Sequence, residues 1–121
     1  NPAAAKFLTD YLKTLNISGD MHALIGIYSD KDISGVISAC HGIFKSWHVT
    51  DLPEERAASA DYVAAQIFEL DVGEIQAYAN IDSALETVQR VVEPQDLLVV
   101  FGSFATVASA IEHLEKQQDN A

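Results

Sequence analysis

Residues 22–40, HALIGIYSDKDISGVISAC, contain a strand, a turn and a helix in succession, and this arrangement identifies the fold class of the chain. The apolar run His22–Tyr28 predicts a strand that is covered on both faces. The turn Ser29–Asp32 follows, and either of its two aspartates can cap a helix over Asp32–Phe44, where apolar side chains recur with a helical period. A strand followed at once by an amphipathic helix is typical of α/β proteins.

The same alternation extends over the whole sequence. Further strands are predicted at Ser46–Thr50, Glu74–Ala79 and Asp96–Phe101, and further helices at Pro2–Leu15, Ser59–Leu70, Asp82–Val92 and Ser103–Gln117. Strict alternation predicts an α/β fold with three layers, in which a mainly parallel, Rossmann-like sheet has helices on both faces. The last strand, DLLVVF, is apolar throughout, which predicts burial on both of its faces.

Caps and core follow from the same patterns. Asn1, Ser59, and Ser103 or the glycine before it, are suitable N-caps. Side chains on apolar helix stripes or at sheet-facing positions are expected in the core, and they include Ala5, Leu8, Leu12, Leu15, Cys40, Phe44, Trp47, Tyr62, Val63, Ile67, Val107, Ile111 and Leu114. Cys40 is expected to act as a small hydrophobic residue and not as a nucleophile.

Length and charge restrict the class of protein. The 121 residues suit a single domain, residues 1–121. Seven Lys and Arg against 18 Asp and Glu give a net charge of −11, which argues against nucleic acid and anionic membranes as partners. The sequence has one cysteine, no apolar run of about 20 residues and no signal-peptide pattern at its start, so we expect a cytoplasmic protein.

The predicted element order begins with a helix, whereas such sheets usually begin with a strand. One interpretation is a small four-stranded sheet. The other is that a strand leading into Asn1 has been removed, which is consistent with the missing initiator Met. The polar tail, residues 115–121, is expected to fray.

Ligands of open α/β sheets bind at the carboxyl ends of the strands, which here indicates three loops. These are Asn1–Pro2, Ser29–Asp32 and Gly102–Phe104. Lys31 is the cation of these loops and can hold a carboxylate or phosphate beside a helix N-terminus, although a plain capping turn also explains its loop. Ser103 offers a hydroxyl at a helix start, where a simple N-cap is the alternative.

Other polar residues give weaker signals. Arg56 could bind an anion, but a local ion pair with Glu54 or Glu55 is the alternative. The four histidines, His22, His41, His48 and His113, show no metal-ligand spacing and are expected to be core or surface residues, and no metal site is predicted. No Ser-His-Asp or Cys-His pairing is suggested, and no GxxxxGK[ST] loop is present.

Four segments together resemble the C-terminal domain of the bifunctional dihydrofolate synthase/folylpolyglutamate synthase family, within the Mur ligase superfamily. NPAAAKFLTDYL is similar to the end of the family's D-x-A-H-N-P motif and its following helix, and ALIGIYSDKDISGVI is similar to its strand-DKD-helix segment. SWHVTDLPEERAASADYVA resembles its W-x-x-x-x-L-x-x-x-R segment, and DLLVVFGSFATVASAIE its terminal strand-GSF-helix.

This resemblance implies a function. Such enzymes use ATP and Mg²⁺ to activate a carboxylate as an acyl phosphate, which the amino group of glutamate attacks, so that dihydropteroate becomes dihydrofolate or a folate gains a glutamate. The C-terminal domain acts as a glutamate-binding lid on an N-terminal ATPase domain, as part of a monomer. By resemblance, Lys31, Asp30 and Ser103 would bind glutamate and Asn1 would lie by the nucleotide. No catalytic residue is assigned, and this chain alone is expected to be inactive and to bind no cofactor.

Two positions depart from the family pattern, because Ala3 and Ala105 stand where the family often has His. Two other functions remain open. One is a stand-alone flavodoxin-like binding module, and the other is the equivalent domain of a cell-wall Mur ligase.

Overall fold

Helices and strands alternate through residues 1–119, the part of the chain that the computed structural model describes. The helices are α1 (Pro2–Lys13), α2 (Ile33–Ala39), α3 (Ala60–Leu70), α4 (Ile81–Val91) and α5 (Phe104–Asp119). The strands are β1 (Met21–Ile25), β2 (Ser46–Thr50), β3 (Glu74–Tyr78) and β4 (Leu97–Phe101). The predicted order of elements is therefore confirmed.

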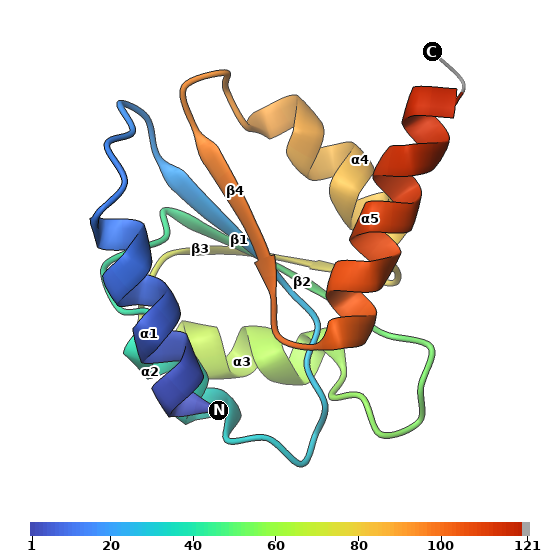
Figure 1. Cartoon of the computed structure of the whole chain (residues 1–121). Coiled ribbons are helices and arrows are strands. Elements are labelled where there is room, and N and C mark those ends of the chain that lie inside the picture. Colours follow the sequence, from blue (N-terminus) through green and yellow to red (C-terminus); the bar gives the residue numbers. More distant parts are fainter. Residues whose placement is uncertain (120–121) are drawn as a thin grey trace.

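All strand pairs are parallel, in the order β3-β2-β1-β4. Helices α1, α2 and α3 lie on one side of the sheet, and α4 and α5 lie on the other (Figure 1). The three-layer, Rossmann-like architecture is thus the one expected. Because the strands are parallel, their carboxyl ends all meet at one edge of the sheet, which we call the carboxyl edge; the opposite edge is the amino edge.

Local hydrogen bonds explain where the helices begin. The side chains of Asn1, Asp32 and Ser59 accept hydrogen bonds from backbone N–H groups in the first turns of α1, α2 and α3. Helix α4 begins one residue before the expected Asp82, because Asn80 is its cap and accepts from the Ser83 N–H at 2.8 Å. These caps satisfy donors that no helix can satisfy from within.

The two faces of the sheet differ in polarity. Against α1–α3 lies the larger apolar core, in which Phe44 and Trp47 meet edge to face with ring centroids 5.1 Å apart. Ala5, Leu12 and Cys40 are also buried there, as predicted. Against α4 and α5 lies a smaller apolar cluster, and the sheet there also carries buried polar side chains.

Some core predictions are wrong. Tyr62 is 54% exposed, because Val63 and Ile67 are the residues with which α3 contacts the sheet. On α5, the buried residues are Thr106 and Ala110. The predicted stripe of that helix is exposed and consists of Val107, Ile111 and Leu114.

Strand β4 is only partly buried, which also differs from the prediction. It lies at the edge of the four-stranded sheet. Within the described residues it therefore pairs with another strand, β1, on one side only. Helix α5 continues through Asp119, two residues beyond the predicted Gln117, and includes residues 115–119 of the polar tail; residues 120–121 lie outside the described residues. In the described part of the chain, no helix has both the length and the apolar character needed to cross a membrane.

A close backbone contact joins β1, β4 and α5 at the carboxyl edge. Gly102 has φ of +114°, and a Cβ atom there would lie 2.5 Å from the carbonyl oxygen of Gly26. The same carbonyl accepts a hydrogen bond from the Thr106 hydroxyl at 2.8 Å. Glycine at both positions therefore allows α5 to begin directly beside the end of β1.

Candidate functional site

A pocket of about 620 Å³ opens at the carboxyl edge, where loops after three strands meet the start of α1. We call it the carboxyl-edge pocket. Its polar lining includes Asn1, Asp30, Lys31, Arg56 and Ser103. A smaller cavity of about 200 Å³ adjoins it and shares Asn1 and Lys31. The structure therefore brings together all four residues that the resemblance selects, from segments about 100 residues apart.

Lys31 and Asp30 lie in the turn between β1 and α2. The Lys31 N–H donates to the Tyr28 carbonyl at 3.2 Å, which closes the turn, and Asp32 caps α2. Both pocket-lining side chains are exposed. Neither forms an ion pair among residues 1–119, so the Lys31 ammonium and the Asp30 carboxylate are free to meet a ligand.

Ser103 precedes α5, and its hydroxyl is already engaged. It accepts from the Thr106 N–H at 3.1 Å and lies 2.8 Å from the Thr106 hydroxyl oxygen. Since the Thr106 hydroxyl donates to Gly26, the Ser103 hydroxyl must be the donor between these two oxygens. The N–H groups of Phe104 and Ala105, which have no partner within the helix, are therefore the free donors at this helix start.

Asn1 caps α1 through its side-chain oxygen, which accepts from the Ala4 N–H at 2.8 Å. Its amide nitrogen keeps two hydrogens for a ligand. The positive end of the α1 dipole lies at the same place, which favours an anion there.

Arg56 belongs to the pocket, and the predicted alternative of a local ion pair is wrong for residues 1–119, where the guanidinium has no carboxylate partner. It lies over the Tyr28 ring at 4.1 Å from the ring centroid. The Arg56 carbonyl accepts from both the N–H and the hydroxyl of Ser29, at 2.8 and 2.9 Å. These contacts hold a second cation beside Lys31.

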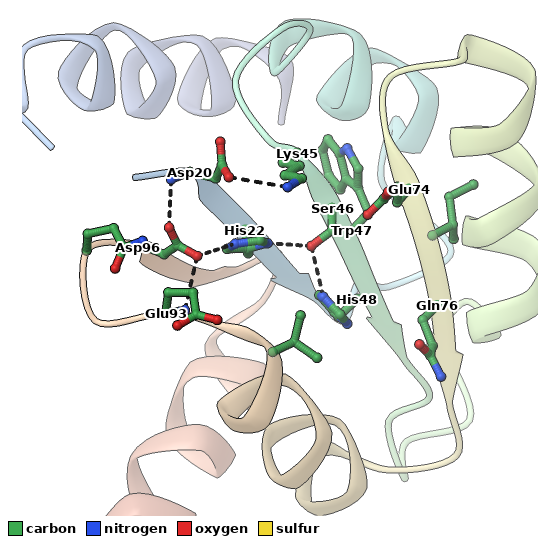
Figure 2. A pocket seen from close by; sticks show the side chains of 13 residues that line it. Asp20, His22, Lys45, Ser46, Trp47, His48, Glu74, Gln76, Glu93 and Asp96 are labelled. Carbon is green, nitrogen blue, oxygen red and sulfur yellow. Dashed lines mark hydrogen bonds and ion pairs between the residues drawn. The ribbon is translucent and has the colours of Figure 1, made fainter. Parts of the chain in front are cut away.

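A second group of polar residues lies on the α4–α5 side of the sheet, and we call it the histidine network. Asp96 contacts His22 at 3.1 Å, His22 contacts the Ser46 hydroxyl at 2.6 Å, and Ser46 contacts His48 at 3.0 Å (Figure 2). His48 in turn contacts the Tyr78 hydroxyl at 2.8 Å. The structure thus contains a Ser46–His22–Asp96 arrangement that the sequence did not suggest.

The sequence does contain a signal for this network. Ser46 and His48 are two residues apart on a strand, so they point to the same face of the sheet, and His22 is paired with Ser46 in the β1–β2 register. The register is a tertiary property, however, and the spacing of the histidines along the chain does not reveal it.

Burial and hydrogen bonds shift the pKa values of two members of the network, Asp96 and His48. Backbone N–H groups of Asp20 and Glu93 and the His22 ring hold the pKa of Asp96 below its usual value. Burial, with a smaller effect of His22, lowers the pKa of His48. The network therefore favours an ionised carboxylate at one end and a neutral His48 ring.

A pocket of about 320 Å³ adjoins the network at the amino edge (Figure 2). Residues 1–119 contain no group of three or more His, Cys, Asp or Glu side chains that could hold a metal ion.

Comparisons with known proteins agree with this fold. Residues 1–104 match the family model described as "Mur ligase, glutamate ligase domain". A curated dihydrofolate synthase/folylpolyglutamate synthase of Escherichia coli is 30% identical over 118 residues, which are 98% of this chain and 27% of that protein. The chain therefore spans about a quarter of the length of this relative.

Solved structures extend the likeness to three dimensions. The structure of E. coli FolC in complex with DHPP and ADP has a TM-score of 0.88 at 28% identity, over 98% of this chain and 27% of that one. A bifunctional folylpolyglutamate synthase/dihydrofolate synthase with Mn, AMPPNP and L-glutamate bound has a TM-score of 0.85 at 30% identity, over 95% of this chain and 27% of that one. The expected type of fold is thus confirmed.

Proposed function

The chain belongs to the glutamate ligase domain family of the Mur ligases, and from this membership we propose that it is the amino-acid-binding domain of an ATP-dependent ligase that adds L-glutamate to dihydropteroate or to a folate. ATP would supply the activation of the acceptor's carboxylate as an acyl phosphate, which the glutamate amino group attacks. Related proteins of this description include structures with AMPPNP, Mn and L-glutamate bound.

The observation that carries the proposal is the convergence of Lys31, Asp30 and Ser103 on the carboxyl-edge pocket. Glutamate has two carboxylates and one ammonium group at neutral pH. Lys31 would attract a carboxylate, the free N–H groups after Ser103 would donate to a carboxylate, and Asp30 would face the ammonium group. Arg56 would provide a second cation for the second carboxylate.

Only part of the ATP and metal chemistry fits the residues of this chain. Asn1 would approach the nucleotide through its amide nitrogen, and the α1 N-terminus favours phosphate oxygens there. Residues 1–119 contain no group of three or more His, Cys, Asp or Glu side chains suited to a metal, so no Mg²⁺ ligand is assigned to them. We propose instead that Mg²⁺ and most of the nucleotide are held by an N-terminal ATPase domain of a cytoplasmic, monomeric enzyme.

The test is the Lys31→Ala variant in a protein that joins this chain to such an ATPase domain. Loss of a charged hydrogen bond costs about 1.5–3 kcal/mol, so kcat/KM for glutamate should fall roughly 10- to 150-fold. The matched control is Lys13→Ala, which removes an exposed lysine from the far end of α1. Unchanged glutamate kinetics in the Lys31 variant would remove Lys31 from the site.

The acceptor is tested separately. The joined protein should consume ATP with glutamate when dihydropteroate or a folate is supplied, and the 121-residue chain alone should form no product. Turnover only with a cell-wall precursor would instead identify the equivalent domain of a wall ligase. A ligand bound by the isolated chain, without any ligase activity of the joined protein, would favour a stand-alone binding module.

A further inference from the structure

The histidine network lies outside the proposed glutamate site and is almost completely enclosed. His22, Ser46, His48 and Tyr78 are 4%, 6%, 5% and 8% exposed, and the Asp96 side chain is 6% exposed. Each residue contacts the next in a single file that crosses three strands, from the amino edge to Tyr78 at the last position of β3. Polar groups buried in this way must satisfy one another.

The direction of every hydrogen bond is determined by the Asp96 end. The Asp96 carboxylate can only accept, so His22 Nε2 carries a hydrogen and, in a neutral ring, His22 Nδ1 accepts from Ser46. The Ser46 oxygen must then accept from His48 Nε2, and His48 Nδ1 must accept from Tyr78. All four donors point toward Asp96.

The carboxylate that sets this direction is itself held firmly. Asp96 Oδ1 accepts from the Asp20 N–H at 2.8 Å, and Oδ2 accepts from the Glu93 N–H at 3.1 Å (Figure 2). These bonds favour the ionised form. The other charged groups that line the adjoining pocket come from the elements around it and are Asp20, Lys45, Glu74 and Glu93. Lys45 contacts Asp20 at 3.4 Å, while α4 presents the apolar Val91 to the pocket.

We propose that the histidine network is a one-proton relay with two hydrogen-bond directions. A proton that joins the Tyr78 oxygen releases the original Tyr78 hydrogen to His48 Nδ1. His48 then passes its Nε2 hydrogen to the Ser46 oxygen, and Ser46 passes its own hydrogen to His22 Nδ1. Protons balance at every atom, and no side chain has to rotate. The charge ends on His22 beside the Asp96 carboxylate, and His48 has changed tautomer.

A second proton does not fit the network. If both rings were charged, both would donate to the Ser46 oxygen, and the Ser46 hydrogen would have no acceptor among the five groups. Two adjacent cations would also repel each other in a buried site. The pair of histidines therefore takes up one proton and not two.

The Tyr78 side chain, at the far end of the relay, belongs to the last residue of β3. The Tyr78 hydroxyl hydrogen is directed into the network in one state and out of it in the other. The Tyr78 carbonyl accepts from the Asp51 N–H at 3.0 Å, and the Asp51 side chain caps α3 at the Ala60 N–H, 2.6 Å away. The residues between Asp51 and Ala60 form the loop that carries Arg56, so the backbone of Tyr78, and not its hydroxyl, contacts the support of that loop.

The experiment is a nitrogen NMR titration of the full 121-residue chain with labelled histidine rings, between about pH 8 and pH 5. Two-bond ¹H–¹⁵N spectra distinguish both neutral tautomers from the imidazolium. At high pH both network rings should carry hydrogen on Nε2. On acidification His22 should become imidazolium, and His48 should change to the Nδ1–H tautomer at the same midpoint. His41, which is exposed and lies outside the network, is the internal reference.

Two variants test whether the Ser46 hydroxyl couples the two histidine rings. Ser46→Ala should abolish the joint transition, so that the His48 tautomer no longer changes at the His22 midpoint, whereas Ser46→Thr keeps a hydroxyl between the two rings and should retain the transition. A His48 ring that stays Nε2–H while His22 titrates, or two rings that both become imidazolium, would overturn the relay. A joint transition that persists in Ser46→Ala would also overturn it.

Discussion

Arg56 illustrates how a single contact changes the role of a residue. Its loop contains two glutamates, yet the guanidinium lies on the Tyr28 ring and faces the carboxyl-edge pocket. Stacking on an aromatic ring holds the planar guanidinium without neutralising its charge, so the charge remains for a ligand.

We therefore expect Arg56→Gln to lower kcat/KM for glutamate by roughly 10- to 150-fold in the joined protein, the equivalent of about 1.5–3 kcal/mol for a charged hydrogen bond. The kcat/KM of Arg56→Lys should lie between the values of the parent protein and of Arg56→Gln, because lysine keeps the charge but loses the planar stacking. Steady-state kinetics with varied glutamate provide the measurement. Arg90→Gln, an exposed substitution in the last turn of α4, is the control and should behave as the parent protein. A similar loss in both variants would argue against a site role for Arg56.

Cys40 is a structural thiol. It is 1% exposed within the core beside α2, and burial raises the pKa of its thiol to about 11. Because the thiolate is the reactive form, the native protein should react slowly with a disulfide reagent at about pH 8 and rapidly after unfolding in denaturant. Absorbance of the released thiol measures both rates. Rapid stoichiometric reaction of the folded protein would contradict this prediction.

At the scale of elements, the join of β4 to α5 depends on a glycine. Gly102 adopts φ of +114° and approaches the Gly26 carbonyl, so Gly102→Ala combines backbone strain with a clash. Gly42→Ala is a matched control, since Gly42 also has positive φ, +80°, but a Cβ atom added there would have no heavy atom within 4 Å.

We expect Gly42→Ala to lower the free energy of unfolding by about 1–2 kcal/mol, the cost of left-handed backbone for an L-residue, and Gly102→Ala to lower it by clearly more. Urea unfolding followed by circular dichroism gives both values. Equal losses in the two variants would show that the contact with Gly26 adds nothing.

Elements also differ in how far their local patterns predict them. The caps of α1, α2 and α3 were predictable because a cap depends on residues three or four positions apart. The buried face of α5 was not, because that helix contacts only part of the sheet, and its more polar side, with Thr106 and Ala110, is turned inward. The hydroxyl of Thr106 is satisfied there by the Gly26 carbonyl, which makes its burial possible.

At the scale of the whole molecule, the polar side of the sheet makes stability depend on pH. Burial lowers the pKa of His48 in the folded state below the ordinary 6.5. The unfolded state therefore binds more protons, so the contribution of His48 to stability is present above about pH 6.5 and is lost as pH falls below it. The lowered pKa of Asp96 acts in the same direction, in the more acidic range below its usual 3.8.

We expect the free energy of unfolding to fall between about pH 7.5 and pH 5.5, with a slope that approaches about 1.4 kcal/mol per pH unit from His48. His48→Gln should flatten this dependence, and His41→Gln, an exposed substitution, should leave it unchanged. Denaturant unfolding at a series of pH values provides the measurement. A slope that His48→Gln does not alter would contradict the assignment.

Local sequence patterns were enough to predict the alternation of elements, the parallel three-layer fold, most helix caps and the three loops around the carboxyl-edge pocket. These features follow from short-range physics, since periodicity and capping depend on neighbouring residues, and the ends of parallel strands necessarily meet at one edge. The place of Lys31, Asp30, Ser103 and Asn1 at the carboxyl edge was predictable for that reason, whereas their roles toward glutamate and nucleotide come from the resemblance and stay predictions.

The contacts across the sheet, in contrast, became apparent only in the folded chain. The order β3-β2-β1-β4 makes β4 an edge strand, and the fold places Arg56 on Tyr28 and aligns His22 with Ser46. Strand order and register depend on the packing of the whole core, and residues 22 and 96 carry no local sign that they will touch. Such contacts form between segments far apart in sequence, after the local elements already exist, so no short window of residues contains them.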